Sequence, residues 1–361
     1  MHTFLILIPL IYIAANIYLF CRTWQAMHNL PIAAKIIVSL LFWVVTFSMF
    51  IAIMLRGSEL PEIYGKGLFR IGSVWLFFSC MAAALLAILD FMRLFFPAMH
   101  GNLWWAVGIV AAVFAYGNYN HRTPQAVKLD ITLDKKMDGE LKMVVVSDLH
   151  LGYGTGKNAL KRYVKLINDC KPDVIIIAGD LIDNSVQAVR NEHMEEELSQ
   201  LQAPQGIYLA AGNHEHISGI EECEEFFAST NIKFLRDSIV TLPCGVQIVL
   251  RDDTTNKRRN SLKKLFAKTD SEKPIVLVDH RPKEIAKCDK AGADLHLSGH
   301  THHGQVWPGN IITDKLYEQS HGYRKWEHAH VWVSSGLSLW GPPVRIGTRG
   351  DYAVITLRGK E

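Results

Sequence analysis

Apolar residues are concentrated in the first third of the chain. Three nearly unbroken apolar runs cover residues 3–20, 36–54 and 71–89, and a shorter fourth run covers 103–116. Each of the first three reaches the roughly 18–20 residues that a helix needs to cross a hydrocarbon core of about 30 Å. The fourth run is shorter, but Trp104 and Trp105 at its start are typical of a membrane–water interface. The pattern predicts an all-α bundle of four transmembrane helices over residues 1–120.

After residue 126 the pattern changes to short β-type runs that alternate with amphipathic helical segments. Strands are expected at 141–146, 174–178, 207–211, 246–250, 275–278, 295–297, 331–334 and 352–357. Helices are expected at 157–169 and 188–201. Strands joined by crossover helices, followed by a strand-rich end, predict a layered α/β sandwich. We assign this domain to residues 141–361, with 121–140 as a linker and first strand.

Charge separates the same two parts. Only six of the 38 basic and three of the 35 acidic side chains lie in residues 1–120, so the remainder is electrically balanced. A balanced domain lacks the basic surface of a nucleic-acid-binding protein, and no nucleic acid polymer is expected as a partner. The six cysteines show neither a CxxC pair nor a zinc-ribbon spacing, which favours buried or incidental thiols.

Basic residues beside the apolar runs bear on membrane topology. Four spans place both termini on one side, together with five flanking basic residues: Arg56, Lys66, Arg70, Arg122 and Lys128. The other side holds three, which are Arg22, Lys35 and Arg93. The positive-inside rule then predicts a multi-pass protein of the cell membrane with its C-terminal domain in the cytoplasm. If the fourth run does not span the membrane, the domain lies on the opposite side.

Polar motifs follow five of the expected strands directly. In chain order they contain Asp148 and His150; Asp180 and Asp183; Asn213, His214 and Glu215; His280; and His300 and His302. Each motif is a weak signal by itself. Because open α/β sheets bind ligands at the carboxyl ends of their strands, however, all five are expected to converge on one rim.

The side-chain types in these motifs predict a metal centre. Imidazole together with carboxylate suits Mn²⁺, Fe or Zn²⁺ better than Ca²⁺ or Mg²⁺, and the absence of thiolates argues against a structural zinc site. A shared carboxylate can give one oxygen to each of two ions, and two ions about 3.5–4 Å apart can clamp a phosphate during displacement. The cofactors expected are therefore two divalent metal ions.

The motif order D-x-H, G-D-x-x-D, G-N-H-E, H and G-H-x-H resembles the signature of the calcineurin-like metallophosphoesterase superfamily. The resemblance covers about residues 141–358. Within it, the sequences of the segments 279–282, 297–302 and 334–350 are similar to those of the YkuE-type bacterial phosphodiesterases. It implies that one metal is bound by Asp148, His150 and His302, and the other by Asn213, His280 and His300. Asp180 would bridge the two metals, and His214 would be the catalytic residue. His303 departs from the pattern, because many relatives have Gly there; it is either a ligand-facing side chain or a harmless surface change.

The sequence thus predicts a membrane-anchored, dinuclear-metal phosphoesterase, in contact with the lipid bilayer. It would hydrolyse a phosphodiester or pyrophosphate, lipid or lipid-linked, by attack of a metal-activated hydroxide. The alternatives are a broad-specificity phosphodiesterase acting on soluble nucleotides, and a non-catalytic membrane scaffold or sensor. A degenerate scaffold would have lost metal ligands, and none of the seven is lost.

Four accessory assignments stay open at this stage. Arg281 is either a phosphate contact or a surface arginine. Asp183 and Glu215 either orient His214 and the ligands or are helix-cap or surface acids. The basic run 257–259 either meets anionic lipid headgroups or is a solvated loop.

Overall fold

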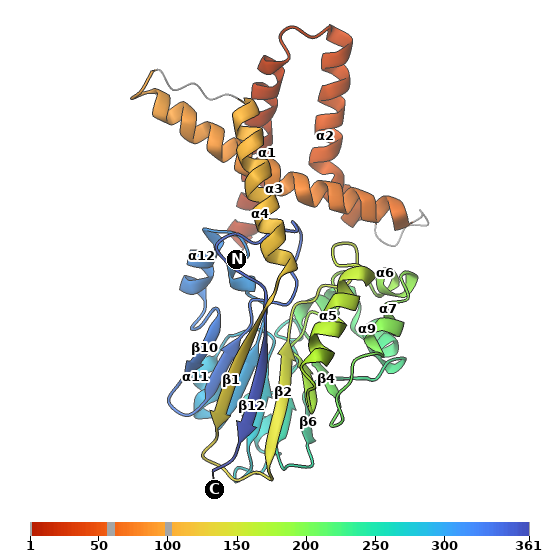
Figure 1. The fold of residues 1–361 in the computed structure, drawn as a ribbon, viewed down its shortest axis with the longest axis vertical. Coiled ribbons are helices and arrows are strands. Elements are labelled where there is room, and N and C mark those ends of the chain that lie inside the picture. The colour runs from red at the N-terminus through yellow and green to blue at the C-terminus, as the bar shows by residue number, and fades with distance from the viewer. Residues whose placement is uncertain (1, 56–61, 98–102, 361) are drawn as a thin grey trace. The chain divides into compact units, whose positions relative to one another are not determined.

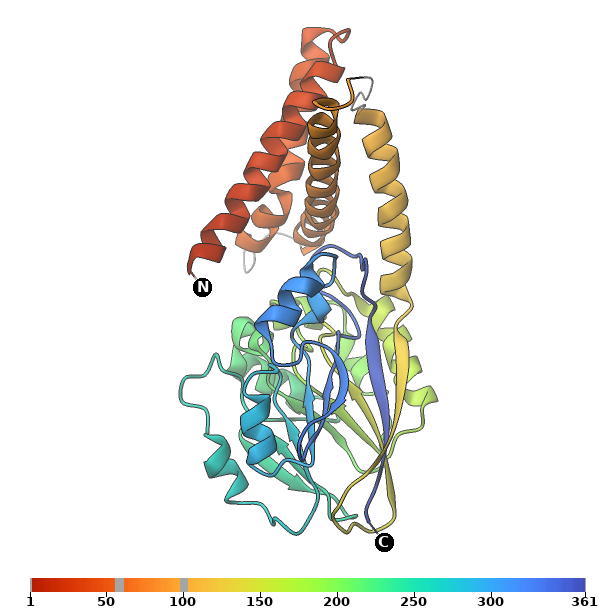
Figure 2. The same cartoon turned by 90° about the vertical axis from the view of Figure 1, so that its left-hand side faces the viewer.

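The computed structural model describes residues 2–55, 62–97 and 103–360, and the chain falls into two compact units (Figures 1 and 2). One unit contains Met1–Tyr119 and Gly341–Val344, and the other contains Asn120–Trp340 and Arg345–Glu361. The domain limits predicted from the sequence at residues 120 and 140 stay predictions.

The first unit is helical. Its helices are α1 (His2–Ala26), α2 (Ile32–Met54), α3 (Glu62–Arg93) and α4 (Leu103–Arg122). Within the described residues, α2 and the Ile63–Arg93 part of α3 are long and apolar enough to cross a membrane. These two helices contain the predicted spans at 36–54 and 71–89, whereas the spans predicted in α1 and α4 stay predictions.

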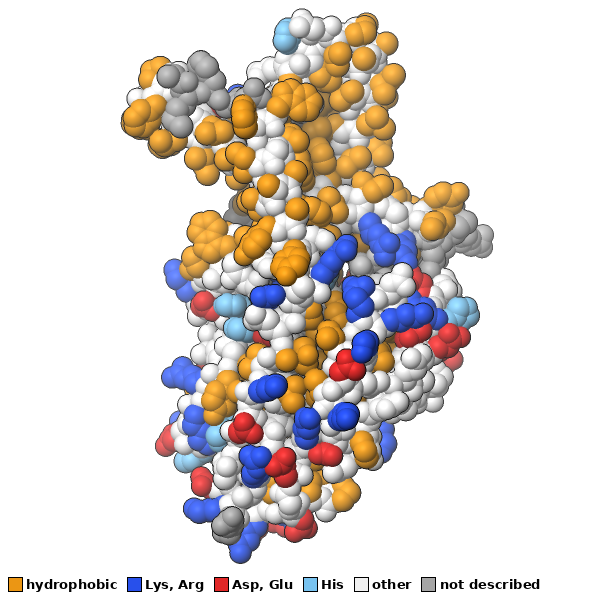
Figure 3. Space-filling model, viewed as in Figure 1, with side chains coloured by type: hydrophobic (Ala, Val, Ile, Leu, Met, Phe, Trp, Pro, Cys, Tyr) orange, Lys and Arg blue, Asp and Glu red, His pale blue; other side chains and the backbone are white. Residues whose placement is uncertain are grey.

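Polar groups inside the helical unit pair with one another. Trp75 Nε1 and Thr46 Oγ1 donate to Asn16 Oδ1 at 3.0 and 3.3 Å, and Asn16 Nδ2 donates to Ser79 Oγ at 3.3 Å. Asn16 therefore links α1 to α2 and α3, as expected of a polar residue between apolar helices. The outer surfaces of these helices are apolar (Figure 3). Side chains such as Ile36, Leu40 and Ile71 are more than half exposed, which suits a lipid environment.

The second unit contains two six-stranded sheets. The first has the order β1-β12-β2-β3-β4-β5, with bounds Gln125–Thr132, Asp351–Arg358, Glu140–Val146, Val174–Ile177, Ile207–Ala210 and Ile232–Leu235. The second has the order β10-β11-β9-β8-β7-β6, with bounds Gly322–Lys325, His330–Val333, Leu295–Ser298, Ile275–Val278, Gln247–Leu250 and Ser238–Thr241. β2, β3, β4 and β5 run parallel to one another, as do β7, β8, β9 and β11.

The alternation of side chains along β2 decides which of its residues pack in each of the two hydrophobic cores. Met143 and Val145 of β2 join a cluster with residues of the second sheet such as Val276 and Leu297. Their neighbours Val144 and Val146 point to the other face, because side chains in a strand alternate, and they pack in a cluster with α5 (Lys157–Asp169). The layered α/β sandwich expected from the sequence is confirmed.

The structure differs from the sequence-based prediction mainly in its short helices and strands. The helix expected at 188–201 is wrong: two short helices, α6 (Val186–Asn191) and α7 (Met194–Leu198), take its place. His193 lies between them with φ of 50°, a left-handed conformation that interrupts a helix. The strands β5, β6 and β10 were not expected, nor were the short helices. These are α8 (Asn213–Ser218), α9 (Ile220–Ala228), α10 (Leu262–Phe266), α11 (Ile285–Lys290), α12 (Gly309–Leu316) and a 3₁₀ turn at His302–Gly304.

Candidate metal centre

The five motifs meet at one rim of the second unit. β2, β3 and β4 are neighbours in the first sheet and β8 and β9 are neighbours in the second, and all five motifs follow the carboxyl ends of these strands. Within the described residues, three groups of side chains each bring their ligand atoms within 4.8 Å of one another: Asp148, His150 and His302; Asp180, His280 and His300; and His150, Asp183 and His214. The rim expected from the sequence therefore exists.

The first group surrounds a small space with nitrogen and oxygen atoms. His150 Nε2 and His302 Nε2 lie 3.1 Å apart. Asp148 Oδ1 lies 3.7 Å from the first of these nitrogens and 3.4 Å from the second. These are the three residues that the family resemblance assigns to one metal.

Asp180 lies between this group and the second one. Its Oδ2 atom is 3.0 Å from His280 Nε2 and 3.9 Å from His150 Nε2. The His280 Nδ1 atom is 2.7 Å from the carbonyl oxygen of Ala178, which favours a proton on Nδ1 and turns Nε2 toward Asp180. One carboxylate thus faces both groups, which is the position that a bridging ligand requires.

Burial and charge together shape the titration of these groups. Burial lowers the pKa of His280, but the negative charges of Asp180 and Asp148 outweigh it and raise the pKa to about 10. Burial raises the pKa of Asp148, yet the positive potential of His302 and His150 holds it below its usual range. The carboxylates therefore stay ionised, and the negative field that raises the pKa of His280 and of His150 is the field that would attract cations.

The backbone of the ligand residues is strained. Five of them have a left-handed conformation: Asp148 (φ 55°), His150 (47°), Asp180 (53°), His300 (71°) and His302 (49°). A residue with a Cβ atom that is held there costs of order 1–3 kcal/mol, and such residues cluster at functional sites. The fold therefore stabilises an unfavourable backbone at the positions that carry the polar side chains.

In each of three motifs, the glycine leaves room for the side chain of a neighbouring metal-ligand residue. A Cβ atom on Gly212 would lie 2.1 Å from Asp180 Oδ1, and one on Gly299 would lie 2.3 Å from Asp148 Oδ2. A Cβ atom on Gly179 would lie 2.5 Å from His280 Nδ1. Only glycine fits at these positions, which explains why Gly precedes Asp180, Asn213 and His300 in the sequence.

Buried polar atoms without a hydrogen-bond partner show whether these residues could bind metal ions. Asn213 Oδ1 is buried and makes no hydrogen bond. Buried polar atoms are nearly always paired, so this unpaired amide oxygen is available to bind a metal ion. Oxygen and imidazole nitrogen donors fit a divalent ion such as Mn²⁺, Fe²⁺ or Zn²⁺. The donor set therefore fits two metal ions.

His214 lies beside the ligands on α8. Its backbone N–H donates to Asp180 Oδ1 at 2.8 Å, and its Nδ1 atom lies 3.1 Å from Asp183 Oδ1. Burial lowers the pKa of His214, but its hydrogen bond to Asp183 and the charge of Asp180 outweigh burial and raise the pKa. Asp183 therefore orients His214, one of the two roles left open for it.

Glu215 has a different role. Its carboxylate is buried and accepts backbone N–H groups of Asp180, Leu181, Ile182 and Gly212 at 2.8–3.1 Å. It therefore ties the turn after β3 to the turn after β4, which positions Asp180 rather than His214. Because Glu215 accepts the N–H of Gly212 at the start of α8, its interpretation as a helix-cap residue is confirmed and its interpretation as a surface acid is wrong.

Arg281 is held in place at the rim. Its Nε atom lies 2.9 Å from Asp253 Oδ2, and its Nη2 atom donates to Thr255 Oγ1 at 3.2 Å. It follows His280 directly in the chain. In the basic run, Arg259 is drawn inward by a contact of 3.2 Å with the buried Asp279, so the run does not form a uniform lipid-facing surface. Lys257 and Arg258 are exposed, in accord with a solvated loop.

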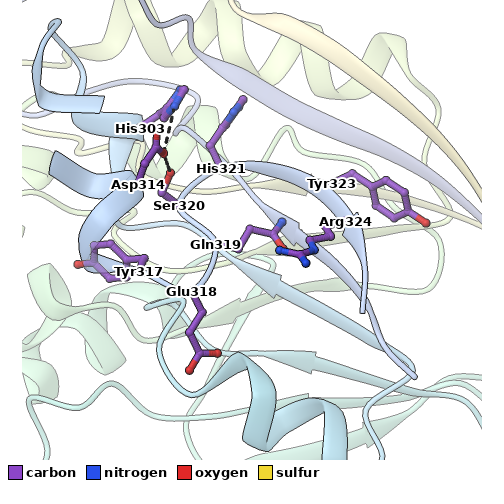
Figure 4. A pocket seen from close by; sticks show the side chains of 9 residues that line it. All are labelled: His303, Asp314, Tyr317, Glu318, Gln319, Ser320, His321, Tyr323 and Arg324. Carbon is purple, nitrogen blue, oxygen red and sulfur yellow. Dashed lines mark hydrogen bonds and ion pairs between the residues drawn. The ribbon is translucent and has the colours of Figure 1, made fainter. Parts of the chain in front are cut away.

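A polar pocket of about 390 Å³ adjoins the second ligand group (Figure 4). The ring of Tyr317 in its wall lies 6.2 Å from the ring of His300. His303 also lines it and stacks on His321 with ring centroids 4.4 Å apart, and Asp314 lies 3.7 Å from His303 Nε2. His303 thus faces a pocket beside the site rather than open surface. Its φ of 47° is a left-handed conformation that glycine would adopt without strain.

Arg345 was not found from the sequence. It is fully buried, and its guanidinium donates to the carbonyl oxygens of His302, Ser335, Gly336 and Ser338. Burial lowers the pKa of Arg345 to about 10. One side chain thus fixes the loop that follows β11 and the backbone of a ligand residue.

Replacing Arg345 by Met is expected to destabilise the protein strongly. Methionine fills part of the volume but leaves the buried carbonyl groups of Ser335 and Ser338 without a donor, and each buried unsatisfied group costs about 1–3 kcal/mol. We expect the free energy of unfolding to fall by about 3 kcal/mol or more, seen as a lower thermal midpoint in detergent micelles. Arg258→Met, at an exposed position, is the matched control and should leave the midpoint unchanged. Equal midpoints for the two variants would contradict this role.

Comparison with known proteins identifies the family. The family model for calcineurin-like phosphoesterases matches residues 141–304. A metallophosphoesterase of Campylobacter jejuni is 30% identical over 262 residues, which are 70% of this chain and 69% of that protein. The chain belongs to the calcineurin-like metallophosphoesterases. This confirms the family resemblance seen in the sequence.

Two further relatives bear on the rest of the chain. YkuE of Bacillus subtilis is 29% identical over 74% of this metallophosphoesterase and 97% of its own length. A zebrafish relative, named a transmembrane protein with metallophosphoesterase domain, is 30% identical over 70% of this chain and 62% of its own. The chain spans 65% of the length of the Helicobacter pylori metallophosphoesterases that it also matches. Calcineurin-like phosphoesterases use pairs of divalent metal ions, and the clusters described above are candidate sites for them.

Proposed function

We propose that the protein is a membrane-anchored phosphodiesterase or pyrophosphatase that hydrolyses a lipid or lipid-linked phosphate ester. The observation that carries the proposal is the position of Asp180, whose carboxylate faces two groups of metal-ligand side chains at once. The ligands would be Asp148, His150 and His302 for one ion and Asn213, His280 and His300 for the other, with Asp180 shared. When bound, the two ions would supply Lewis-acid activation of the phosphate and of the attacking water.

The chain's own residues supply the remaining steps. His214, with Nδ1 held by Asp183, is placed to give a proton to the leaving oxygen. Arg281, oriented by Asp253, binds a phosphoryl oxygen through its planar guanidinium. The pocket beside His300 takes the part of the substrate beyond the phosphate. Its two histidines, two tyrosines, Arg324 and Gln319 suit a polar, hydroxyl-bearing group.

Membrane attachment favours a lipid-bound substrate over a soluble one. The apolar helices α2 and α3 and the transmembrane relative suggest membrane association. A tethered site meets membrane substrates at high effective concentration. The multi-pass arrangement with a cytoplasmic catalytic domain also remains part of the proposal. Arg56, one of the basic residues on which that orientation depends, lies outside the described residues.

The purified full-length protein in Mn²⁺ is expected to hydrolyse one member of a panel of phosphate esters. The panel contains bis(4-nitrophenyl) phosphate, 4-nitrophenyl phosphate, a nucleotide sugar and a phospholipid in mixed micelles, each assayed with and without EDTA. His214→Ala should reduce the rate by about 10²–10⁴-fold, the usual contribution of a general acid. His193→Ala, an exposed histidine, is the matched control and should keep the full rate.

The outcomes separate the candidate functions. Hydrolysis of the phospholipid well above the two nitrophenyl esters supports the lipid substrate, and hydrolysis of soluble diesters alone supports the broad-specificity alternative. No metal-dependent hydrolysis of any ester would leave the non-catalytic scaffold.

A further inference from the structure

Helix α12 presents an apolar surface that nothing within the described residues covers. None of its side chains is buried, and Ile311, Ile312 and Leu316 are 45%, 54% and 69% exposed. Trp307, just before the helix, is 61% exposed. A helix on the surface of a globular domain normally turns its apolar side chains inward. These four residues, called here the α12 apolar surface, do the opposite.

The segment 345–349 connects this surface to the start of the domain. The backbone N–H of Trp307 donates to the carbonyl of Ile346 at 2.8 Å, and Thr348 Oγ1 donates to the carbonyl of Gln305 at 2.7 Å. The same segment binds the chain where it leaves α4, since Arg349 Nε donates to the carbonyl of Thr123 at 3.0 Å. The α12 apolar surface therefore belongs to the end of the domain at which the chain emerges from the helices.

The side chains at the end of α4 indicate a membrane interface at this point. Tyr116 and Tyr119, in the last two turns before the domain begins, are 59% and 62% exposed. Tyrosine and tryptophan with one face exposed are enriched where a helix leaves the hydrocarbon core. The described residues also include two helices that are long and apolar enough to cross the bilayer. The helices that precede this end of the domain in the chain thus favour a lipid surface as its partner.

The composition of α12 suits that partner. Trp, Ile and Leu enter the boundary between headgroups and acyl chains, and the exposed Lys315 can reach anionic headgroups from the same helix. Asp314 faces the other way, into the pocket beside His300 (Figure 4). The helix therefore presents apolar side chains on one side and a wall of the polar pocket on the other.

We propose that α12 docks on the lipid bilayer by inserting Trp307, Ile311, Ile312 and Leu316 at the headgroup boundary. Docking holds the pocket and the metal centre beside it at the membrane surface, where the headgroup of a membrane lipid can enter. The docking itself is independent of which ester is hydrolysed, and its test requires no enzymatic activity.

Spin labels on the full-length protein in vesicles of phosphatidylcholine and phosphatidylglycerol measure the depth of single residues. Ile312→Cys is labelled with a nitroxide in a Cys21→Ser background, since Cys21 is the exposed native thiol among the six. Glu272→Cys is the control: it is exposed, and the carbonyl of its neighbour Lys273 binds Lys135 just past the far end of β1. β1 has eight residues and therefore spans about 23 Å. The control lies about that distance from the opposite end of β1, which is hydrogen-bonded to Gly350.

The label at residue 312 is expected to be relaxed several-fold more by oxygen, relative to a water-soluble nickel complex, than the label at 272. Moving the protein into lipid-free amphipol should abolish the difference. Equal exposure of both labels to the nickel complex in vesicles would overturn the proposal. The proposal would also be overturned if the spectrum of the label at 312 were broadened by a second label at 312 and showed no preference for oxygen. That result would favour a surface that joins two copies of the chain.

Discussion

Replacing Asp180 by Asn is expected to remove metal-dependent phosphoesterase activity while leaving the domain folded. Asparagine keeps an oxygen for the backbone N–H of His214, which Asp180 Oδ1 accepts at 2.8 Å. It loses the negative charge of Oδ2, which faces His280 at 3.0 Å and His150 at 3.9 Å. A neutral amide cannot give an oxygen to each of two cations and still attract both. Even residues that only support metal ligands contribute about 10–100-fold, so the rate should fall by more than about 100-fold.

Metal content separates this explanation from a general loss of structure. The metal bound per chain, measured by mass spectrometry after gel filtration, should fall from two ions to one or none in Asp180→Asn. Asp169→Asn makes the same chemical change at an exposed residue of α5, where an ion pair contributes little, and should keep both metals and the full rate. Two ions per chain with full activity in Asp180→Asn would show that this carboxylate does not bridge.

The positions of the rim residues could be predicted because their strands are simple. Segments such as 174–177 and 275–278 are continuous apolar runs, as expected of strands buried on both faces, and the motif residue follows within a few positions. The carboxyl ends of parallel strands meet at one edge, so a one-dimensional pattern was enough to place Asp180 near His280. Periodicity also identified α5, whose apolar residues at 160, 164 and 167 lie on one buried face.

Other features depend on contacts that the sequence does not encode locally. Nothing in the sequence distinguishes Arg345 from the other arginines, because its partners are backbone carbonyls that only folding brings together. The break at His193 is a single residue with positive φ in a segment whose composition still favours a helix. α12 has eight residues, about two turns, too few to show a clear period, and its exposed apolar side chains resemble a core helix in sequence. The pocket beside His300 joins residues 303–324, where no strong pattern stood out.

Replacing Gly212 by Ala is the second change with a large expected effect, and it tests how tightly the rim is packed. Gly212 has φ of −99° and ψ of −174°, an extended backbone that alanine adopts without strain. The effect must therefore come from the methyl group, which would lie 2.1 Å from Asp180 Oδ1 and 2.6 Å from the Asp180 nitrogen. Because Glu215 also binds both of these turns, the backbone has little freedom to move away. Asp180 should shift, and a displacement of about 1 Å can cost about 10²-fold in rate.

Gly245→Ala provides the opposite pattern and so makes the test specific. Gly245 has φ of 89° with nothing within 4 Å of an added Cβ atom, so alanine there is strained but touches no neighbour. Its free energy of unfolding should fall by about 1–2 kcal/mol, while its rate and metal content stay those of the parent protein. Gly212→Ala should lose rate and metal far out of proportion to any change in its thermal midpoint. If both variants lose activity only as far as they lose stability, the close approach of Gly212 to Asp180 has no part in building the metal centre.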